Sequence, residues 1–341
     1  MMSESFPLTT VRLRFHCQAE SPLHLGGWQA GSNLRGALLN VMTRATCAAS
    51  SLTPSPSPQS GRGGKRLSGE ELAAHTATCP VCWLVQAHEQ PGQERRGYTV
   101  IPPLNGPEVL EAGQAFTFWI RLFGEAVEYL PYFALAVPEA GRSGVGYGWP
   151  RGRFSLRQVW AERLLEDDWQ VLAELGHVFY PPEHPVGHGE VLGLAGRLSG
   201  QLEGQRARVK ITFLTPLRLV EDQKLVKSPD FGVFFARLLE RVDFLAKQFG
   251  GGYARPVEER ERLWAAANRV RLVESQTRWV EVASGSARTG EKTWLSGLVG
   301  PAVYSTTLED WDVLFPWLVW GQLTQVGKDT AKGNGVFVVE T

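Results

Sequence analysis

The chain has 341 residues, of which 43% are hydrophobic and 10% aromatic, so it is long enough for two ordinary domains with real cores. Lys+Arg and Asp+Glu both total 35. This balance neither supports nor excludes a polyanionic partner, and any surface for one must be a local patch. No apolar run approaches membrane-spanning length, and the first residues lack the pattern of a signal peptide. We therefore expect a cytoplasmic protein without membrane contact.

The first half begins with an alternating segment, residues 11–17, which predicts a strand. A loop over residues 21–31 separates it from a capped helix at residues 32–42. Further along, β-branched and aromatic runs and a glycine cluster indicate three more elements. They are a strand at 116–123, a helix at 125–137 and a strand at 152–156, which together complete a first domain over residues 1–160.

A low-complexity stretch interrupts this first domain. Residues 53–64 are mostly Pro, Ser and Gly with almost no apolar side chain, so they cannot offset the entropy of ordering. We predict a disordered insertion near residues 50–70.

The second half has its own series of elements. We expect strand 207–214, helix 231–249, strand 277–282, strand 293–303, helix 308–320 and strand 336–339. This β-α-β-β-α-β order is the ferredoxin-like pattern, in which helices cover one face of an antiparallel sheet. It defines a second domain over residues 205–341, and residues 161–204 are interpreted as a linker with a short helix.

The two halves share a weak internal repeat. Leu130-Pro131-Tyr132 and Phe315-Pro316-Trp317 are separated by the same number of positions as Gly148 and Gly333. Each half thus places a glycine-rich turn and a strand after a helix with an apolar-Pro-aromatic step. The fold class we predict is α+β, with tandem ferredoxin-like domains, antiparallel sheets and glycine-rich loops.

The glycine-rich run Gly327–Gly335 alternates glycine with Lys328 and Lys332 and precedes a strand. Glycine lets backbone N–H groups approach an anion, and the lysines add positive charge, so the run is interpreted as a phosphate-facing loop. It does not match a nucleotide-triphosphate loop, which ends in Gly-Lys-Ser/Thr and opens a helix. The structural alternative is a glycine-rich hairpin with solvated lysines.

Four segments together resemble the CRISPR-associated repeat-processing endoribonucleases of the RAMP superfamily, the Cas6 family, over nearly the whole chain. They are Gly31-Ser32-Asn33-Leu34-Arg35-Gly36-Ala37-Leu38, Gly144-Val145-Gly146-Tyr147-Gly148 with Gly152-Arg153-Phe154, Ser296-Gly297-Leu298-Val299-Gly300, and Gly327–Gly335. The resemblance implies tandem ferredoxin-like domains that bind CRISPR repeat RNA and cut it without a metal. A ribose 2′-OH would attack the adjacent phosphate and leave a 2′,3′-cyclic phosphate and a 5′-hydroxyl.

This cleavage needs a base for the 2′-OH proton, a donor for the phosphorane and an acid for the leaving oxygen. Histidine suits the base because its pKa lies near neutrality. In the resembling enzymes the catalytic histidine is commonly in or around the first helix, where this chain has His16 and His24. We take His24, in the loop entering that helix, as the candidate base, while His16 belongs to the strand. If His24 only packs the loop, lysines and arginines would stabilise the phosphorane instead.

Several cations are candidate RNA contacts. Arg35, near the start of the first helix, could meet a phosphate or form a structural ion pair. Lys328 and Lys332 are expected to contact the RNA backbone. A further set occupies alternate positions of the first strand of the second half, either tracking the RNA backbone or forming a solvated sheet face: Arg206, Arg208 and Lys210.

The four cysteines do not indicate a disulfide scaffold. Cys79 and Cys82 have the two-residue spacing that holds one metal, with His75 just before them and Cys47 upstream. These four residues predict a possible structural zinc site with three thiolates and an imidazole. The alternative is small buried cysteines near Trp83.

The leading hypothesis is therefore a CRISPR repeat endoribonuclease that needs no cofactor for catalysis. Its partners would be repeat RNA or its processed crRNA and, in addition, subunits of a CRISPR effector complex. The first rival is a non-catalytic RAMP-type crRNA-binding subunit, which would need no base. The second is a nucleotide-binding enzyme that uses the glycine-lysine loop for a phosphate, against which the missing helix counts.

Overall fold

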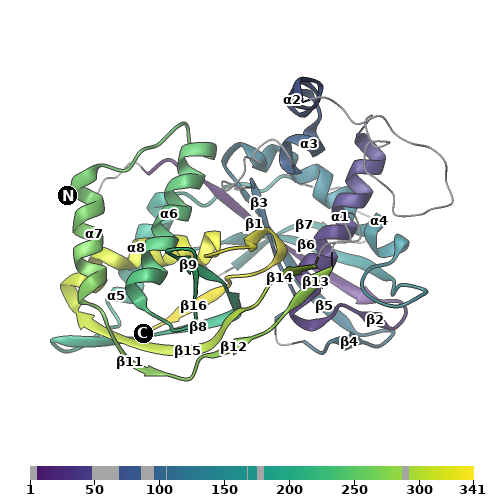
Figure 1. Ribbon diagram of the computed structural model, residues 1–341. Helices are drawn as coiled ribbons and strands as arrows, with labels where there is room; N and C mark the ends of the chain where they lie inside the picture. The colour runs from purple at the N-terminus through teal and green to yellow at the C-terminus, as the bar shows by residue number, and fades with distance from the viewer. Residues whose placement is uncertain are drawn as a thin grey trace.

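The computed structural model describes residues 6–47, 69–85, 96–104, 106–166, 168–174, 180–285 and 292–341. Two α+β units lie side by side, the N-terminal one on the right and the C-terminal one on the left of Figure 1. The predicted insertion near residues 50–70 lies outside the described residues up to residue 68, and residues 69 and 70 begin a helix.

The first unit is built on a five-stranded antiparallel sheet. The strand order is β3 (Tyr98–Ile101), β5 (Ala115–Phe123), β1 (Thr10–Ala19), β6 (Phe154–Arg163) and β7 (Asp168–Glu174). Along β1 buried and half-buried residues alternate, so that Leu13 and Phe15 enter the core while Arg12 and Arg14 face outward. The first strand prediction is confirmed, and the edge strand β3, which pairs with β5, was not predicted.

Two helices cover the inner face of this sheet. In α1 (Ala30–Thr46) the residues Leu34, Leu38, Val41 and Met42 are buried, which is the spacing of one helical face. The second helix is α4 (Leu130–Ser143), entered through the 3-10 turn η3 (Gly124–Tyr129). Small elements complete the unit: β2 (Leu23–His24) paired with β4 (Val109–Leu110), the 3-10 turn η1 (Gly27–Gln29), α2 (Gly69–Thr78) and α3 (Pro80–Val85).

The second unit has the sheet order β11 (Arg271–Ser275), β15 (Gly297–Thr307), β8 (Arg206–Leu217) and β16 (Phe337–Glu340). The neighbouring strand β12 (Arg278–Val280) also pairs with β15. Two hairpins extend from this unit: β9 (Leu219–Glu221) with β10 (Lys224–Val226), and β13 (Ala283–Gly285) with β14 (Lys292–Trp294). The single strand expected at 293–303 is therefore two strands, because residues 295 and 296 separate β14 from β15.

Helix α6 (Phe231–Phe249) has the bounds that the sequence predicts, and the side chain of Asp230 caps it by accepting from the Val233 N–H at 2.9 Å. Helix α8 (Leu308–Thr324) is buried nearly all round, since α5 (His188–Ser199), α6 and α7 (Val257–Arg269) all pack against it. The 3-10 turn η4 (Thr330–Lys332) lies in the terminal glycine run.

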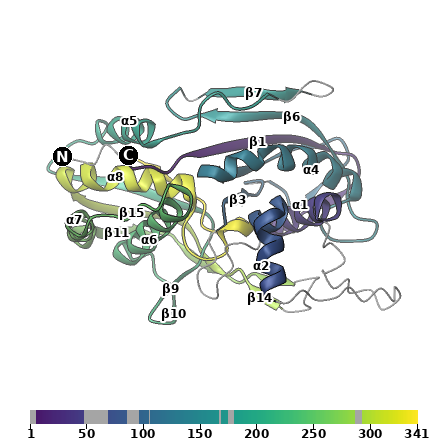
Figure 2. The ribbon, with the colours of Figure 1, turned by 90° about the horizontal axis from the view of Figure 1, so that it is seen from above.

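Both units follow the ferredoxin-like order, and the α+β tandem architecture with glycine-rich loops is confirmed. The proposed boundary at 160 and the linker 161–204 need correction. Strand β6 continues to Arg163, β7 extends the first sheet, and α5 packs against α8 of the second unit (Figure 2). Strand β7 therefore belongs to the first unit, and α5 belongs to the second.

Candidate functional site

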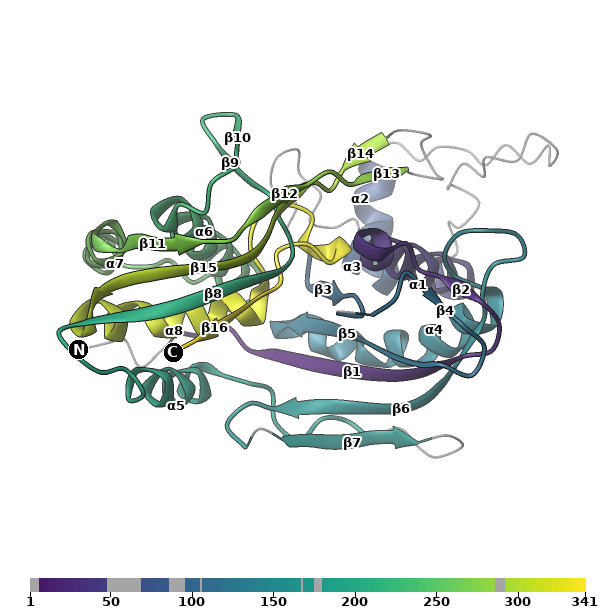
Figure 3. The same cartoon turned by 90° about the horizontal axis from the view of Figure 1, so that it is seen from below.

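The first turn of α1 is where three separate segments of the chain meet. A methyl group on Gly31 would collide with the carbonyl oxygen of Lys332, so the terminal glycine run packs directly on this turn. On another side Gln29 donates through Nε2 to the Ala283 carbonyl, and Ser32 Oγ lies 3.3 Å from Ser284 Oγ. Figure 3 shows the β13–β14 hairpin crossing from the second unit to α1.

The electrostatics of this turn favour an anion. No side chain caps the helix start, and its first turn contains no acidic residue. The N–H groups at a helix start carry partial positive charge and are the usual partners of phosphate oxygens. Sequence reasoning missed Gln29, Ser32 and Ser284, because nothing in the local pattern indicates that residues so distant in sequence meet.

His24 lies beside the first glycine-rich loop, residues 144–148. It belongs to β2, its side chain is exposed, and its carbonyl oxygen accepts from the Tyr147 N–H at 2.9 Å. Gly146 has φ +86°, and a methyl group there would collide with the His24 carbonyl oxygen. The backbone of His24 is thus held between β4 and the loop, with its imidazole directed to solvent.

The other candidate histidines have different surroundings. His16 lies on the outward face of β1, 3.4 Å from Thr117 Oγ1 through Nδ1, and burial, followed by Arg14, lowers its pKa. His188 is buried in α5 rather than in a linker, and its Nδ1 accepts from Trp320 Nε1 at 3.0 Å. Burial, with a smaller contribution from Arg255, lowers the pKa of His188 to about 4. It is therefore a neutral core residue.

The terminal glycine run does not form the open phosphate loop that its sequence suggested. Thr330 and Asn334 are buried, and the N–H groups of Lys328, Lys332, Gly333, Asn334 and Gly335 all donate to backbone oxygens. The Asn334 side chain donates to the Leu295 carbonyl at 2.9 Å. Five backbone donors of the run are thus already used, and its contact with Gly31 makes it a packed connection between the units.

Its two lysines differ in their surroundings. Lys328 is exposed, whereas Lys332 is half-buried and pairs with Asp329 at 2.8 Å. Arg35 lies in the second turn of α1 and donates from Nε to the hydroxyl of buried Tyr98 at 3.0 Å. Lys328 thus offers a free charge to solvent, while Arg35 and Lys332 have protein partners.

The basic strand of the second half has the predicted geometry. Arg206, Arg208 and Lys210 are all exposed on one face of β8, between alternating buried residues. Lys210 also pairs with Glu340 of β16 at 3.0 Å. Arg206 and Arg208 therefore contribute most of the positive charge of this face.

Cys47, His75, Cys79 and Cys82 converge, with their ligand atoms all within 4.8 Å of one another. Cys47 ends α1, and the other three come from α2 and α3 and the turn between them. Cys47 Sγ lies 3.6 Å from Cys82 Sγ and 3.3 Å from His75 Nε2. Tetrahedral zinc with Zn–S near 2.3 Å places sulfur atoms about 3.8 Å apart, so this donor set fits a zinc ion.

Without a metal, the surroundings of this cluster disfavour the negatively charged thiolate form of its cysteines. Burial, with hydrogen bonds from neighbouring thiols, raises the pKa of Cys82 above its usual range. A bound divalent ion would reverse this, because it favours the thiolate. The cluster attaches the C-terminal end of α1 to α2 and α3.

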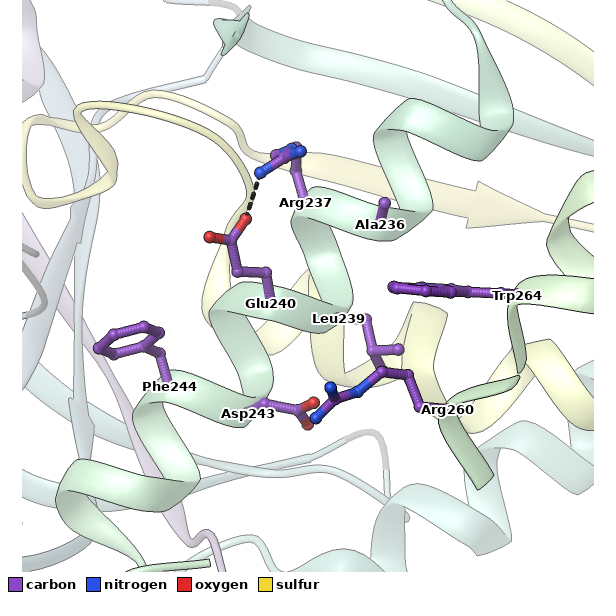
Figure 4. Close-up of a pocket in the computed structure, with 8 residues that line it drawn as sticks. All are labelled: Ala236, Arg237, Leu239, Glu240, Asp243, Phe244, Arg260 and Trp264. Carbon is purple, nitrogen blue, oxygen red and sulfur yellow. Dashed lines mark hydrogen bonds and ion pairs between the residues drawn. The ribbon is translucent and has the colours of Figure 1, made fainter. Parts of the chain in front are cut away.

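A groove of about 320 Å³ lies elsewhere, between α6 and α7. Figure 4 shows Trp264 and Arg260 of α7 facing α6, where Arg237 pairs with Glu240 at 2.6 Å. No residue predicted for the site lines this groove.

Among the described helices, none has the length and apolar character needed to cross a membrane.

The fold is that of proteins with two ferredoxin-like units in one chain and a glycine-rich loop after the second helix of each. Family models agree along the chain: the AF_1859_N N-terminal domain matches residues 7–183, and the CRISPR-associated endoribonuclease Cas6 matches residues 211–337. Residues 211–337 thus carry a Cas6-family domain.

Solved structures agree on the fold. A Cas6 (TTHB231) product complex is 17% identical, with TM-score 0.53, over 97% of this chain and 99% of that one. Thermus thermophilus Cas6 (TTHB231) is 15% identical, with TM-score 0.53, over 97% and 98%. A partial Cas6-RT-Cas1–Cas2 complex is 11% identical, with TM-score 0.59, over 100% of this chain and 47% of that chain. No curated protein matched the sequence.

Proposed function

We propose that the protein is a metal-independent endoribonuclease that cleaves CRISPR repeat RNA, with His24 as the general base. His24 takes the proton of a ribose 2′-OH, the freed oxygen attacks the adjacent phosphorus, and the bond to the 5′-oxygen breaks. The departing oxygen receives a proton, which leaves a 2′,3′-cyclic phosphate and a 5′-hydroxyl. This reaction consumes no cofactor.

The observation that carries this proposal is the position of His24. Its imidazole is exposed while its backbone is fixed between β4 and the first glycine-rich loop. A solvent-facing imidazole can accept a proton from a bound hydroxyl. The start of α1 follows six residues later, and its first turn carries no acidic residue that would repel a phosphate.

The RNA backbone would extend from this site over exposed cations. Arg206, Arg208 and Lys210 form the basic face of β8, and Lys328 adds an exposed charge after α8. Phosphate contacts of this kind hold RNA in register but do not read its sequence. Processed crRNA and subunits of a CRISPR complex are the partners we propose, since one structural neighbour is a Cas6-RT-Cas1–Cas2 complex.

The second candidate function is a non-catalytic crRNA-binding subunit. Within the described part of the chain, no side chain hydrogen-bonds to the His24 ring, so no group fixes its tautomer. A binding subunit would use the same cations and needs no oriented base.

One experiment separates the two functions. Purified protein is incubated in EDTA with end-labelled repeat RNA, and the products are examined for one cut that ends in a cyclic phosphate. His24→Ala should lower the cleavage rate at least about 100-fold with little change in RNA affinity. His184→Ala, at another exposed histidine, is the matched control and should cleave normally. Binding without cleavage by the unaltered protein would establish the subunit function.

We also propose that Cys47, His75, Cys79 and Cys82 hold one structural zinc ion. The support is their mutual distances and the closed set of four donors. Elemental analysis should find about one equivalent of zinc, and Cys79→Ser should lose it. Cys17→Ser is the control, because Cys17 is a buried thiol of β1 that is not one of the four residues. Less than a tenth of an equivalent in the unaltered protein would exclude the site.

A further inference from the structure

The outward face of the first sheet carries an array of arginine and tryptophan side chains, which we call the Arg–Trp face. Every second residue of a strand points to the same side, and the register of β1 with its neighbours places these side chains opposite one another. The Arg–Trp face consists of Arg12 and Arg14 on β1, Trp119 and Arg121 on β5, Trp160 on β6 and Trp169 on β7.

The guanidinium groups of β1 lie close to indole rings. The central carbon of Arg14 lies 4.3 Å from the Trp160 ring centre and 5.0 Å from that of Trp169. Arg12 lies 5.2 Å from the Trp119 ring centre and 5.5 Å from that of Trp169. Each cation therefore lies within cation–π distance of two rings.

The positive charge of the Arg–Trp face exceeds its negative charge. Among the described residues, Glu162 is the carboxylate that contacts these arginines, at 2.7 Å from Arg12 and 3.5 Å from Arg121. Arg121 is only 2% exposed, and burial, opposed by Glu162 and assisted by Arg12, lowers its pKa to about 9. Two of the three guanidinium groups, Arg12 and Arg121, share this carboxylate, and Arg14 is not paired with it, so a further anion would lower the electrostatic cost.

Buried donors on the same face lack acceptors. The Nε atoms of Arg12, Arg14 and Arg121, Nη1 of Arg121 and Nε1 of Trp119 have no hydrogen-bond partner among the residues that the structure describes. An unpaired buried donor costs about 1–3 kcal/mol, and five of them on one sheet face are not offset by the protein itself. These atoms are themselves covered, so an incoming ligand would meet the half-buried guanidinium groups of Arg12 and Arg14, where a ligand with acceptor oxygens and stacking rings would fit.

We propose that the Arg–Trp face binds a single-stranded segment of RNA, whose phosphates pair with the arginines while its bases stack on the exposed edges and faces of the tryptophans. Arginine and aromatic side chains are the usual platform for unpaired RNA bases. Arg14 and Arg12 lie about 17 and 23 Å along β1 from its end at Ala19, so this surface is separate from His24. The inference rests on the proposed function only in taking RNA as the ligand.

The test uses the full chain and short labelled oligouridine, which forms no stem. The double change Arg12→Gln with Arg14→Gln should lower RNA affinity at least tenfold. It should also reduce the salt slope, which is the slope of log affinity against log salt concentration, by about 1.4, at about 0.7 per lost phosphate contact. Trp160→Leu should lower affinity with an unchanged slope, because it removes stacking without removing charge. Arg142→Gln, at an exposed arginine of α4, and Trp264→Leu, in α7, are the matched controls and should bind normally.

A second measurement covers the case in which the double variant does not fold. Unaltered protein is crosslinked to oligouridine that carries a photoreactive uridine, and crosslinked peptides should include β1, β6 or β7. Unchanged affinity and slope in folded variants, or crosslinks confined to other segments, would overturn the inference. The inference would also be overturned if the variants kept RNA binding but selectively lost binding to a polyglutamate peptide. The Arg–Trp face would then be a protein contact.

Failure of this inference can be distinguished from failure of the proposed function. Cleavage of repeat RNA by variants with unaltered oligouridine binding would leave the endoribonuclease proposal intact. Oligouridine binding that depends on Arg12 and Arg14 in a protein that never cleaves would leave the Arg–Trp face intact.

Discussion

The two glycine-rich loops occupy equivalent places, each following the second helix of its unit, yet their contacts differ. The first, residues 144–148, bonds to His24 and leaves the Tyr147 side chain 47% exposed. The second, Gly327–Gly335, packs against the first turn of α1 and the end of β3, and most of its residues are buried or half-buried.

In both loops glycine allows the backbone to come close to another segment, but the segment that it approaches differs. Gly146 allows the first loop to approach the carbonyl oxygen of His24, beside a solvent-facing imidazole. Gly335 allows the second loop to fold back on the carbonyl oxygen of Val326. The first loop presents side chains to solvent, and the second joins the two units.

The largest expected effect is on stability, from Gly335→Ala. The residue has φ +74°, and a methyl group would collide with the Val326 carbonyl oxygen, so we expect a loss of about 3 kcal/mol or more. Urea unfolding measures it. The matched change in the first loop is Gly148→Ala, at φ +98° with nothing nearer than 4.0 Å, which should cost only about 1 kcal/mol. Equal costs would contradict the contrast between the loops.

Gly31→Ala tests the contact between the second loop and α1. Alanine within a helix normally stabilises by about 1 kcal/mol, but here the methyl group meets the Lys332 carbonyl, so we expect a net loss of about 2 kcal/mol. Gly36→Ala, in the same helix with open space around it, should stabilise. Thermal melting compares the stability of the two variants. Stabilisation by Gly31→Ala would show that the second loop does not pack on α1.

Gly146→Ala tests the first loop through catalysis. Displacing the His24 backbone should misplace the imidazole and lower the rate of RNA cleavage about tenfold or more, since small errors in position are costly. RNA affinity should change little. Single-turnover cleavage measures the effect, with Gly148→Ala as control. A normal rate in a folded Gly146→Ala protein would separate the loop from the chemistry.

The smallest effect distinguishes the two lysines of the second loop. Lys328→Ala should weaken binding of repeat RNA a few-fold and reduce the salt slope by about 0.7, because its charge is exposed. Lys332→Ala should leave the slope nearly unchanged, since Lys332 pairs with Asp329. Equilibrium binding at several salt concentrations compares them. A larger effect of Lys332→Ala than of Lys328→Ala would place the RNA against the buried side of the loop.

Much of the fold could be predicted because local periodicity determines it. The alternation in β1 and the apolar face of α6 are properties of neighbouring residues, and the β-α-β-β-α-β order follows from their sequence. The docking of α5 on α8 could not be predicted, since its short amphipathic pattern also fits an isolated helix in a linker.

The candidate site was harder to predict because it depends on contacts between distant residues. The cysteine spacing indicated one metal site, and the structure brings Cys47 to the other three donors. By contrast, the glycine and lysine content of the terminal run indicated an open anion loop, while the structure uses its N–H groups internally. Arg12 and Arg14 alternate on a predicted strand, a signal that could have identified the Arg–Trp face beforehand.

The hairpin that reaches α1 also has a consequence for how the protein is assembled. Gln29 and its partner Ala283 are 254 positions apart, and Ser32 and Ser284 are 252 apart. Each unit has a core of its own, whereas these contacts close a very long loop of chain and are favoured to form late in folding. A separately expressed N-terminal unit would build its sheet yet leave the start of α1 without its neighbours. The surroundings of the first turn of α1 would then be completed in one late event, when the two units dock.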